Sequence, residues 1–207
     1  MIHIADYGLG NPASIVNMLR KAGHEAMVTA SADDLKAASK LILPGVGAFD
    51  HAMRNLKERD LIDVLTEKAL GERVPTLGIC LGMQIMTRSS EEGDLPGLGW
   101  ISAATPRFFF PDAERQDLRI PHMGWNQIGR FDAGHPLLAG LPAAARFYFV
   151  HSYHVTCDEP ADVLATAHHG YEFAAIVAHH NIVAVQFHPE KSHTFGLTLL
   201  KNFAEQC

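Results

Sequence analysis

The feature that most constrains this fold is residues 75–84, Pro-Thr-Leu-Gly-Ile-Cys-Leu-Gly-Met-Gln. The apolar run after Arg73 predicts a buried strand, Gly-x-Cys-x-Gly interrupts it, and the residues from Met83 onward can begin a helix. A tight strand-to-helix turn lifts a reactive side chain clear of the sheet, and flanking glycines let strand and helix approach closely. The stretch therefore predicts an α/β fold that presents Cys80 at the end of a strand.

Two chemical consequences follow for Cys80 at such a turn. The N-terminus of the next helix stabilises a thiolate, which is the nucleophilic form of cysteine. The N–H of Leu81 can donate a hydrogen bond to an oxyanion formed at an attacked carbonyl. The alternative is a buried structural cysteine, since free cysteine often acts as a small core residue. A catalytic interpretation needs a base and a second oxyanion donor elsewhere in the chain.

Length and composition limit the classes of protein. The chain has 207 residues, 47% of them hydrophobic, which fits one globular domain. A net charge of −6 argues against nucleic acid as an electrostatic partner. No uncharged apolar stretch reaches about 18 residues, so we expect no membrane span, and no basic-then-apolar leader begins the sequence. Three widely spaced cysteines suggest no disulfide framework and fit a cytoplasmic location.

Short apolar runs alternate with helical patterns along most of the sequence. This alternation predicts a mainly parallel sheet with helices on both faces. The Gly- and Pro-rich spacing later in the chain predicts short antiparallel strands at residues 97–101 and 107–110. The expected strands include residues 2–5, 26–28, 41–43, 147–155 and 182–190.

The strand at residues 41–43 ends in Pro-Gly-Val-Gly. Glycines on both sides of Val46 leave a bare backbone that can approach a ligand closely. Placed beside Cys80, the N–H groups of Val46 or Gly47 would supply the second oxyanion donor. Taken alone, the stretch favours a simple glycine turn before a helix.

The candidate base lies in the strand at residues 182–190. This apolar strand ends in His188-Pro189-Glu190, and Pro189 favours an extended backbone at His188. An extended backbone places His188 and Glu190 on the same side, so the carboxylate can hold the imidazole in the tautomer that accepts the thiol proton. The alternative is a charged strand end with a turn proline. With the strand-to-helix turn at Cys80 already present, we favour catalysis.

Two other kinds of ligand, a metal ion and a dinucleotide, are alternatives to this interpretation. His168-His169 and His179-His180 are adjacent pairs that point to opposite faces of a strand, so we expect no metal site. Gly8-x-Gly10-x-x-Ala13 follows a strand and fits a loose dinucleotide fingerprint, with Asp33 and Asp34 downstream. The proline at position 12 is awkward for phosphate-facing N–H groups, and we regard nucleotide binding as the weaker hypothesis.

The two catalytic stretches resemble the class I (triad) glutamine amidotransferases. They are residues 78–84, Gly-Ile-Cys-Leu-Gly-Met-Gln, and 187–192, Phe-His-Pro-Glu-Lys-Ser. Within that class, the chain is similar to the glutaminase subunits of imidazole glycerol phosphate synthase (HisH) at residues 6–11, 121–126 and 151–153. The resemblance implies one class I domain over residues 1–207. Its fold would be flavodoxin-like, with a mainly parallel sheet flanked by helices and a small antiparallel sheet in the C-terminal half, and no cofactor.

The resemblance also implies roles for individual residues. Cys80 would attack the side-chain amide of glutamine to form a glutamyl thioester, His188 would move the proton, and Glu190 would orient His188. The oxyanion hole would comprise Leu81 with Val46 and Gly47. The residues expected to position glutamine are Gly45, Gln84, Ser152 and Tyr153.

A glutaminase that occupies all 207 residues leaves no domain to use the ammonia. The family implies a heterodimer with a TIM-barrel cyclase, HisF, which receives ammonia through a sealed passage. That cyclase forms imidazole glycerol phosphate and aminoimidazole carboxamide ribotide in histidine biosynthesis. The positions expected at this interface are Asn11, Met123, Trp125 and Lys191.

The sequence departs from the family pattern at Pro12-Ala13, where the family often has larger residues, and at His154, where an aromatic residue is more usual. Residues 97–101 are similar to a subgroup that supplies ammonia for sugar or surface-polysaccharide amidation. That acceptor remains an alternative, as do a partner-independent cysteine hydrolase of the same fold and a non-catalytic binding module.

Overall fold

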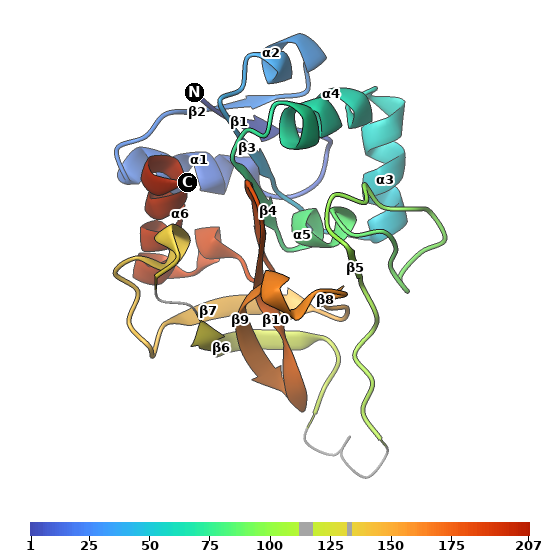
Figure 1. The fold of residues 1–207 in the computed structure, drawn as a ribbon, viewed down its shortest axis with the longest axis vertical. Coiled ribbons are helices and arrows are strands. Elements are labelled where there is room, and N and C mark those ends of the chain that lie inside the picture. Colours follow the sequence, from blue (N-terminus) through green and yellow to red (C-terminus); the bar gives the residue numbers. More distant parts are fainter. Residues whose placement is uncertain (112–117, 132–133) are drawn as a thin grey trace.

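The computed structural model describes residues 1–111, 118–131 and 134–207, and within these ranges a nine-stranded sheet runs through the molecule (Figure 1). The strand order is β2-β1-β3-β4-β11-β10-β9-β6-β7. The first five strands are parallel: β2 (Ala26–Thr29), β1 (Ile2–Ala5), β3 (Lys40–Leu43), β4 (Thr76–Ile79) and β11 (Ile182–Val185). The rest are antiparallel: β10 (Tyr171–His179), β9 (Val163–His169), β6 (His122–Phe131) and β7 (Arg146–His151).

The parallel strands are short and almost wholly apolar because helices cover both of their faces. At the centre, Leu77 of β4 is in register with Ile42 of β3 and Val183 of β11, and all three are buried. Alternate residues along a strand enter different cores: Ile42 packs in one hydrophobic cluster, whereas Leu41 and Leu43 pack in the other. The expected strands at 2–5, 26–28 and 41–43 are therefore present.

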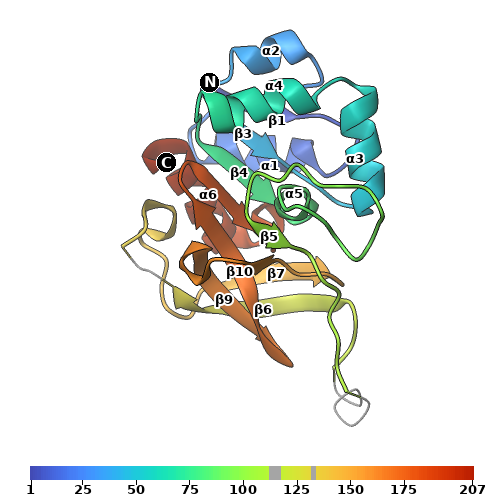
Figure 2. The ribbon, with the colours of Figure 1, turned by 45° about the vertical axis from the view of Figure 1, so that its right-hand side comes forward.

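Helices form a layer on each side of the sheet (Figures 1 and 2). On one side α1 (Pro12–Lys21) and α6 (His193–Gln206) contribute Leu19 and Phe203 to the core. The other side carries α2 (Ala32–Lys36), α3 (Phe49–Glu58), α4 (Ile62–Thr66), the π-helix η1 (Glu67–Gly71) and α5 (Leu81–Ile85). The described residues also form short 3-10 helices, which are η2 (Pro136–Leu138), η3 (Pro160–Asp162) and η4 (Pro189–Lys191).

The loops that follow β1, β3, β4 and β11 meet at one edge of the sheet, because parallel strands have their carboxyl ends on the same side. Glycines allow the close approach. A Cβ on Gly10 would lie 3.1 Å from the Pro44 Cβ, and a Cβ on Gly45 would lie 2.6 Å from the Gly82 nitrogen. These contacts fill the space beside the loop at Gly8 and Gly10, which fits the loose dinucleotide fingerprint. This edge is therefore where a site can assemble.

The expected fold class is confirmed, with a mixed sheet between two helix layers and a small antiparallel sheet formed by β5 (Ala103–Ala104) and β8 (Thr156–Cys157). The predicted strands at 97–101 and 107–110 are wrong. The N–H groups of Leu98 and Trp100 bond to carbonyls of Ile85 and Met86 at the end of α5, so this segment is held irregular. At residues 107–110 the structure has only an isolated bridge. Among the described residues, no helix is long and apolar enough to cross a membrane.

Candidate active site

Cys80 lies at a strained turn between β4 and α5. Its backbone has φ 53° and ψ −108°, a positive φ that is costly for any residue except glycine and is typical of a residue held for function. The turn is fixed from both sides: Cys80 N–H donates to the Val185 carbonyl at 2.8 Å, and Met83 N–H donates to the Cys80 carbonyl at 3.0 Å. The predicted strand-to-helix turn is present, and the helix begins at Leu81.

The glycines beside Cys80 have a steric role. A Cβ on Gly82 would collide with the Leu43 carbonyl oxygen, and a Cβ on Gly78 would lie 2.8 Å from the Met86 sulfur. The first contact involves backbone, which cannot move aside as a flexible side chain can. Gly82 is therefore required for α5 to lie against β3, which in turn sets the position of the thiol.

His188 and Glu190 follow β11 and form a buried pair. His188 is extended (φ −103°, ψ 96°), as expected before proline. Its Nδ1 lies 2.8 Å from Glu190 Oε1, and the two side chains are 1% and 2% exposed. Because a carboxylate only accepts, Nδ1 carries the hydrogen, which leaves Nε2 to receive a proton. Among the described residues Nε2 is buried without a geometric hydrogen-bond partner.

The pKa of His188 reflects its two partners. Burial alone lowers the pKa, but the interactions with the Cys80 and Glu190 side chains outweigh burial and raise it to about 10. The imidazolium form is therefore favoured when Cys80 is a thiolate and Glu190 is ionised. Such a thiolate–imidazolium pair is an activated nucleophile with its proton stored on the neighbouring base.

One cavity of about 260 Å³ collects most of the predicted site residues. Glu190 lies behind His188, and Gly45 is buried against Gly82 and Leu81 rather than in the lining. The small volume suits a ligand smaller than a drug-sized molecule. The predicted residues that line the cavity are Val46, Gly47, Cys80, Leu81, Gln84, Ser152, Tyr153 and His188.

The two predicted oxyanion donors border this cavity. Leu81 is the first residue of α5, so its N–H has no acceptor within the helix. Val46 and Gly47 come from the loop after β3, and Gly47 has φ 125°, which favours glycine. The buried Tyr7 hydroxyl donates to the Pro44 carbonyl and holds the base of that loop. Tyr7 is a structural contributor that the sequence did not indicate.

Three further residues with polar side chains reach the site without having been predicted. Glu92 and His151 line the cavity, and Gln186 Nε2 donates to Cys80 Sγ at 3.7 Å. Glu92 accepts a hydrogen bond from Phe49 N–H at 2.9 Å, and burial raises the pKa of its carboxyl. Gln186 was signalled only by its place in the strand predicted at residues 182–190, which in the structure ends at Val185, before the 3-10 helix η4. Glu92 lies in a loop with no distinctive spacing.

The predicted interface residues lie on the surface near this edge of the sheet. Met123 is 63% exposed and Trp125 41% exposed. The Trp125 ring stacks on His193 with a centroid distance of 5.2 Å, and Lys191 Nζ lies 5.8 Å from the Tyr148 ring. Tyr148 also contacts Trp125, which makes Trp125 and Lys191 parts of one surface. Asn11 instead caps α1, where its side chain accepts from Ser14 N–H.

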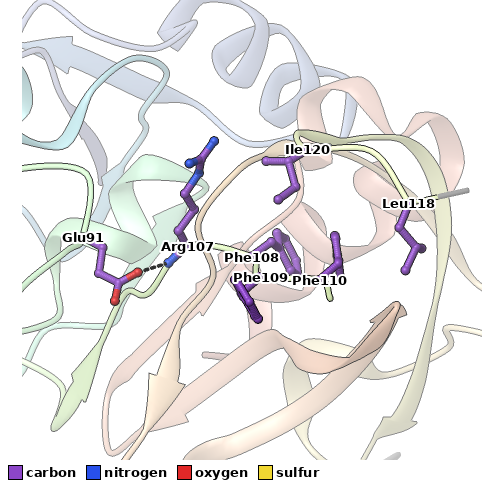
Figure 3. A pocket seen from close by; sticks show the side chains of 7 residues that line it. All are labelled: Glu91, Arg107, Phe108, Phe109, Phe110, Leu118 and Ile120. Carbon is purple, nitrogen blue, oxygen red and sulfur yellow. Dashed lines mark hydrogen bonds between the residues drawn. The ribbon is translucent and has the colours of Figure 1, made fainter. Parts of the chain in front are cut away.

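A larger cavity of about 490 Å³ lies elsewhere, at residues 91, 107–110, 118 and 120 (Figure 3). Aromatic and aliphatic side chains gather around it, and Glu91 accepts a hydrogen bond from Arg107 N–H at 2.7 Å. None of the predicted site residues lines it. Within the described ranges, no group of three His, Cys, Asp or Glu side chains could hold a metal ion. The smaller cavity at Cys80 is therefore the candidate active site.

Comparison with known proteins agrees with this geometry. The family model "Glutamine amidotransferase class-I" matches residues 3–207. The chain is 49% identical over 205 residues to imidazole glycerol phosphate synthase subunit HisH 2 of Pseudomonas aeruginosa, covering 99% of each protein. It is 50% identical over 207 residues to HisH 2 of Methanococcus maripaludis, covering both completely.

Solved structures with low sequence identity share the fold. The structure of PurLQS from Thermotoga maritima superposes with a TM-score of 0.74 at 16% identity, over 98% of this chain and 96% of that chain. The glutaminase domain of CTPS from Trypanosoma brucei gives a TM-score of 0.63 at 13% identity, over 100% and 94%. On the family match and the full-length relatives, the chain belongs to the class-I glutamine amidotransferases and, within them, to the HisH subunits of imidazole glycerol phosphate synthase.

Proposed function

We propose that this chain is the glutaminase subunit of an imidazole glycerol phosphate synthase, a single domain over residues 1–207 that works in the cytoplasm without a cofactor. It hydrolyses glutamine to glutamate and ammonia and passes the ammonia to a HisF-type cyclase. The observation that carries the proposal is the strained Cys80 in one small cavity with His188, whose other ring nitrogen is bonded to Glu190.

The chemistry follows from these three side chains. The Cys80 thiolate attacks the amide carbon of glutamine, and the resulting oxyanion accepts hydrogen bonds from the backbone at Leu81 and at Val46–Gly47. The His188 imidazolium then gives its proton to the departing nitrogen as the C–N bond breaks, which leaves a thioester and ammonia. Water attacks the thioester, His188 takes one of its protons, and glutamate leaves as the thiolate is restored.

The cavity lining also supports an α-amino acid as substrate. Glu92 is the carboxylate among the lining residues, and burial together with the charge of Asp50 raises its pKa, against the hydrogen bond from Phe49. A substrate ammonium group would offset the charge of Glu92. The Gln84 amide and the backbone at Ser152 and Tyr153 offer hydrogen-bonding groups in the same cavity. We therefore add Glu92 to the residues proposed to hold glutamine.

A partner is part of the proposal because ammonia is protonated in neutral water and then ceases to be a nucleophile. Met123, Trp125 and Lys191 give an exposed aromatic and basic surface suited to a docking interface. Asn11, from the loop after β1, is proposed to meet the partner at a separate position.

The decisive experiment is glutamate release by the purified chain, alone and with its cognate cyclase and the cyclase's nucleotide substrate. We expect strong stimulation by the cyclase, and none in Cys80→Ala. Glu92→Gln should raise the KM for glutamine, because it removes the proposed partner of the substrate ammonium. No Cys80-dependent glutamate under any condition would refute the proposal.

The second candidate has the same chemistry and a different ammonia acceptor. Two similar relatives are named HisH 2 rather than HisH, which makes a second acceptor pathway worth testing. Cys80-dependent activity that is indifferent to the histidine-pathway cyclase would favour sugar or polysaccharide amidation. Activity on peptides or glutamyl conjugates without a partner would favour an independent hydrolase.

A further inference from the structure

A run of hydrogen bonds leads from β6 to the thiol through two buried histidines that the proposed chemistry does not use. His122 of β6 and His151 of β7 are directly paired across the antiparallel ladder. His122 Nδ1 lies 3.0 Å from His151 Nε2, and both residues are buried. The neighbouring positions Met123 and Trp125 point to the opposite, exposed side of β6. One strand therefore carries both the surface residues and the start of this run.

The partners at each end fix both tautomers. His151 Nδ1 lies 2.7 Å from the Tyr153 carbonyl, which can only accept, so Nδ1 carries the hydrogen. In a neutral ring His151 Nε2 then accepts, and His122 Nδ1 must donate to it. His122 Nε2 is left as an acceptor for Asn126 Nδ2 at 3.2 Å. The same Asn126 nitrogen donates to the His168 carbonyl at 2.8 Å, which sets the amide's orientation.

Both rings are held neutral by their surroundings. Burial lowers the pKa of His122 to about 4, with a contribution from His169, and burial lowers the pKa of His151 to about 3. The Phe108 ring, which borders the cavity of Figure 3, lies 5.3 Å from the His151 ring. A protonated His151 would direct an N–H at the N–H of His122. The hydrogen bond from His122 to His151 therefore requires His151 to be neutral.

Beyond His151 the run continues into the cavity. The Tyr153 carbonyl accepts a second hydrogen bond from Gln84 Nε2 at 3.1 Å. The other hydrogen of that amide goes to Gln186 Oε1 at 3.2 Å, and Gln186 Nε2 donates to Cys80 Sγ. Gln84 cannot rotate without breaking both of its bonds. Its orientation thus depends on the position of the Tyr153 carbonyl, which His151 holds from the other side.

We infer that His122 and His151 are positioning residues of the glutaminase site, which hold the Tyr153 carbonyl, and through it Gln84, in the geometry that receives glutamine. The inference rests on the proposed glutaminase function. His151 borders the cavity, but both of its ring nitrogens are engaged, so it orients the site through Tyr153 and does not take part in proton transfer. Its loss should therefore affect glutamine binding more than the reactivity of the thiol.

The test compares variants in the complex with the cyclase. His151→Phe keeps a ring of similar size and removes the hydrogen bonds. His151→Asn is the conservative rescue, because its amide nitrogen can take the place of Nδ1 and donate to Tyr153. His154→Phe is the matched control: His154 is equally buried in the same aromatic cluster, but its Nε2 bonds to the Tyr171 hydroxyl, outside the run.

For His151→Phe we expect the KM for glutamine to rise about 10-fold, with a smaller change in kcat. A rise of this size corresponds to the loss of one hydrogen bond to the segment that holds the substrate. The rate of Cys80 alkylation by iodoacetamide, which needs no glutamine site, should stay within about twofold. Alkylation by 6-diazo-5-oxonorleucine, which is shaped like glutamine, should fall in parallel with the KM effect. His151→Asn and His154→Phe should both resemble the wild type, and His122→Phe should lie between His151→Phe and the wild type.

An unchanged KM in His151→Phe would overturn the inference. So would an equal rise in His154→Phe, which would indicate general disruption of the aromatic cluster, or a parallel loss of iodoacetamide reactivity. Nitrogen NMR of the imidazoles in the wild-type protein supplies a test that depends neither on an activity assay nor on the folding of a variant. It should find both imidazoles, His122 and His151, neutral with the ring hydrogen on Nδ1. Any other tautomer would contradict the assigned series of hydrogen bonds. Failure of the proposed function would instead appear as a wild type without Cys80-dependent glutamate release.

Discussion

Replacing Glu190 by Gln removes the charge that holds His188 while keeping the shape of the side chain. The bond that changes joins Glu190 Oε1 to His188 Nδ1 at 2.8 Å, between side chains no more than 2% exposed. Hydrogen bonds to charged groups contribute about 1.5–3 kcal/mol, because little water remains to compensate for their loss. That range corresponds to a fall in kcat/KM for glutamine of about 10- to 150-fold.

The assay is the rate of Cys80 alkylation by iodoacetamide as a function of pH. In the wild type the raised His188 pKa, about 10, favours an imidazolium beside Cys80 at neutral pH. In Glu190→Gln the contribution of Glu190 to that rise is lost, so the His188 pKa falls and less imidazolium remains beside Cys80. The rate should therefore fall most near pH 6.5, and the deficit should shrink above the ordinary thiol pKa of about 8.5.

Glu172→Gln is the control, because it removes an exposed carboxylate of β10. We expect it to keep the wild-type pH profile. If Glu190→Gln also keeps that profile, with a rate within about twofold at every pH, then Glu190 does not stabilise the imidazolium and the assignment of the triad fails.

Three further predictions concern stability and are measured by urea unfolding. Gly82→Ala should lower the free energy of unfolding by about 3 kcal/mol or more, because the new Cβ meets the Leu43 carbonyl, and an unchanged midpoint would contradict this contact. Tyr7→Phe should cost about 1–2 kcal/mol by leaving the buried Pro44 carbonyl without its donor, and no loss would remove Tyr7 as the support of that loop. His151 has a folded pKa of about 3, below its unfolded value, so the unfolded chain binds the extra proton and stability falls as pH drops from about 6.5 toward 3. Between pH 7.5 and 5 this amounts to about 2 kcal/mol, which His151→Phe should remove; an identical pH dependence in the variant would refute the lowered pKa.

The sequence alone determined the parallel part of the sheet and the nucleophile. Strands β1, β3 and β4 are almost wholly buried, so short and mainly apolar runs identify them without knowledge of their partners. Gly-x-Cys-x-Gly defines a local backbone geometry, and His188-Pro189-Glu190 sets a local spacing. Each of these patterns lies within a few consecutive residues and does not depend on distant contacts, so the conformation that it predicts is also found in the folded chain.

Local patterns failed where distant segments decide the conformation. Residues 97–101 alternate like a strand, but their N–H groups are taken by carbonyls of α5. Glu92 reaches the cavity only because its loop folds against the start of α3 at Phe49. No spacing in the sequence indicates either contact.

The pairing of His122 with His151 is the clearest case of a feature that only the tertiary structure decided. The two residues are 29 positions apart, and the register of β6 with β7 brings their ring nitrogens within 3.0 Å. The sequence contains thirteen histidines, and although these two lie in stretches similar to HisH, nothing in the sequence indicates that they pair. Local geometry fixes which residue is the nucleophile, whereas the protonation and orientation of the groups around it depend on burial and on hydrogen-bond partners, which exist only once the sheet has assembled.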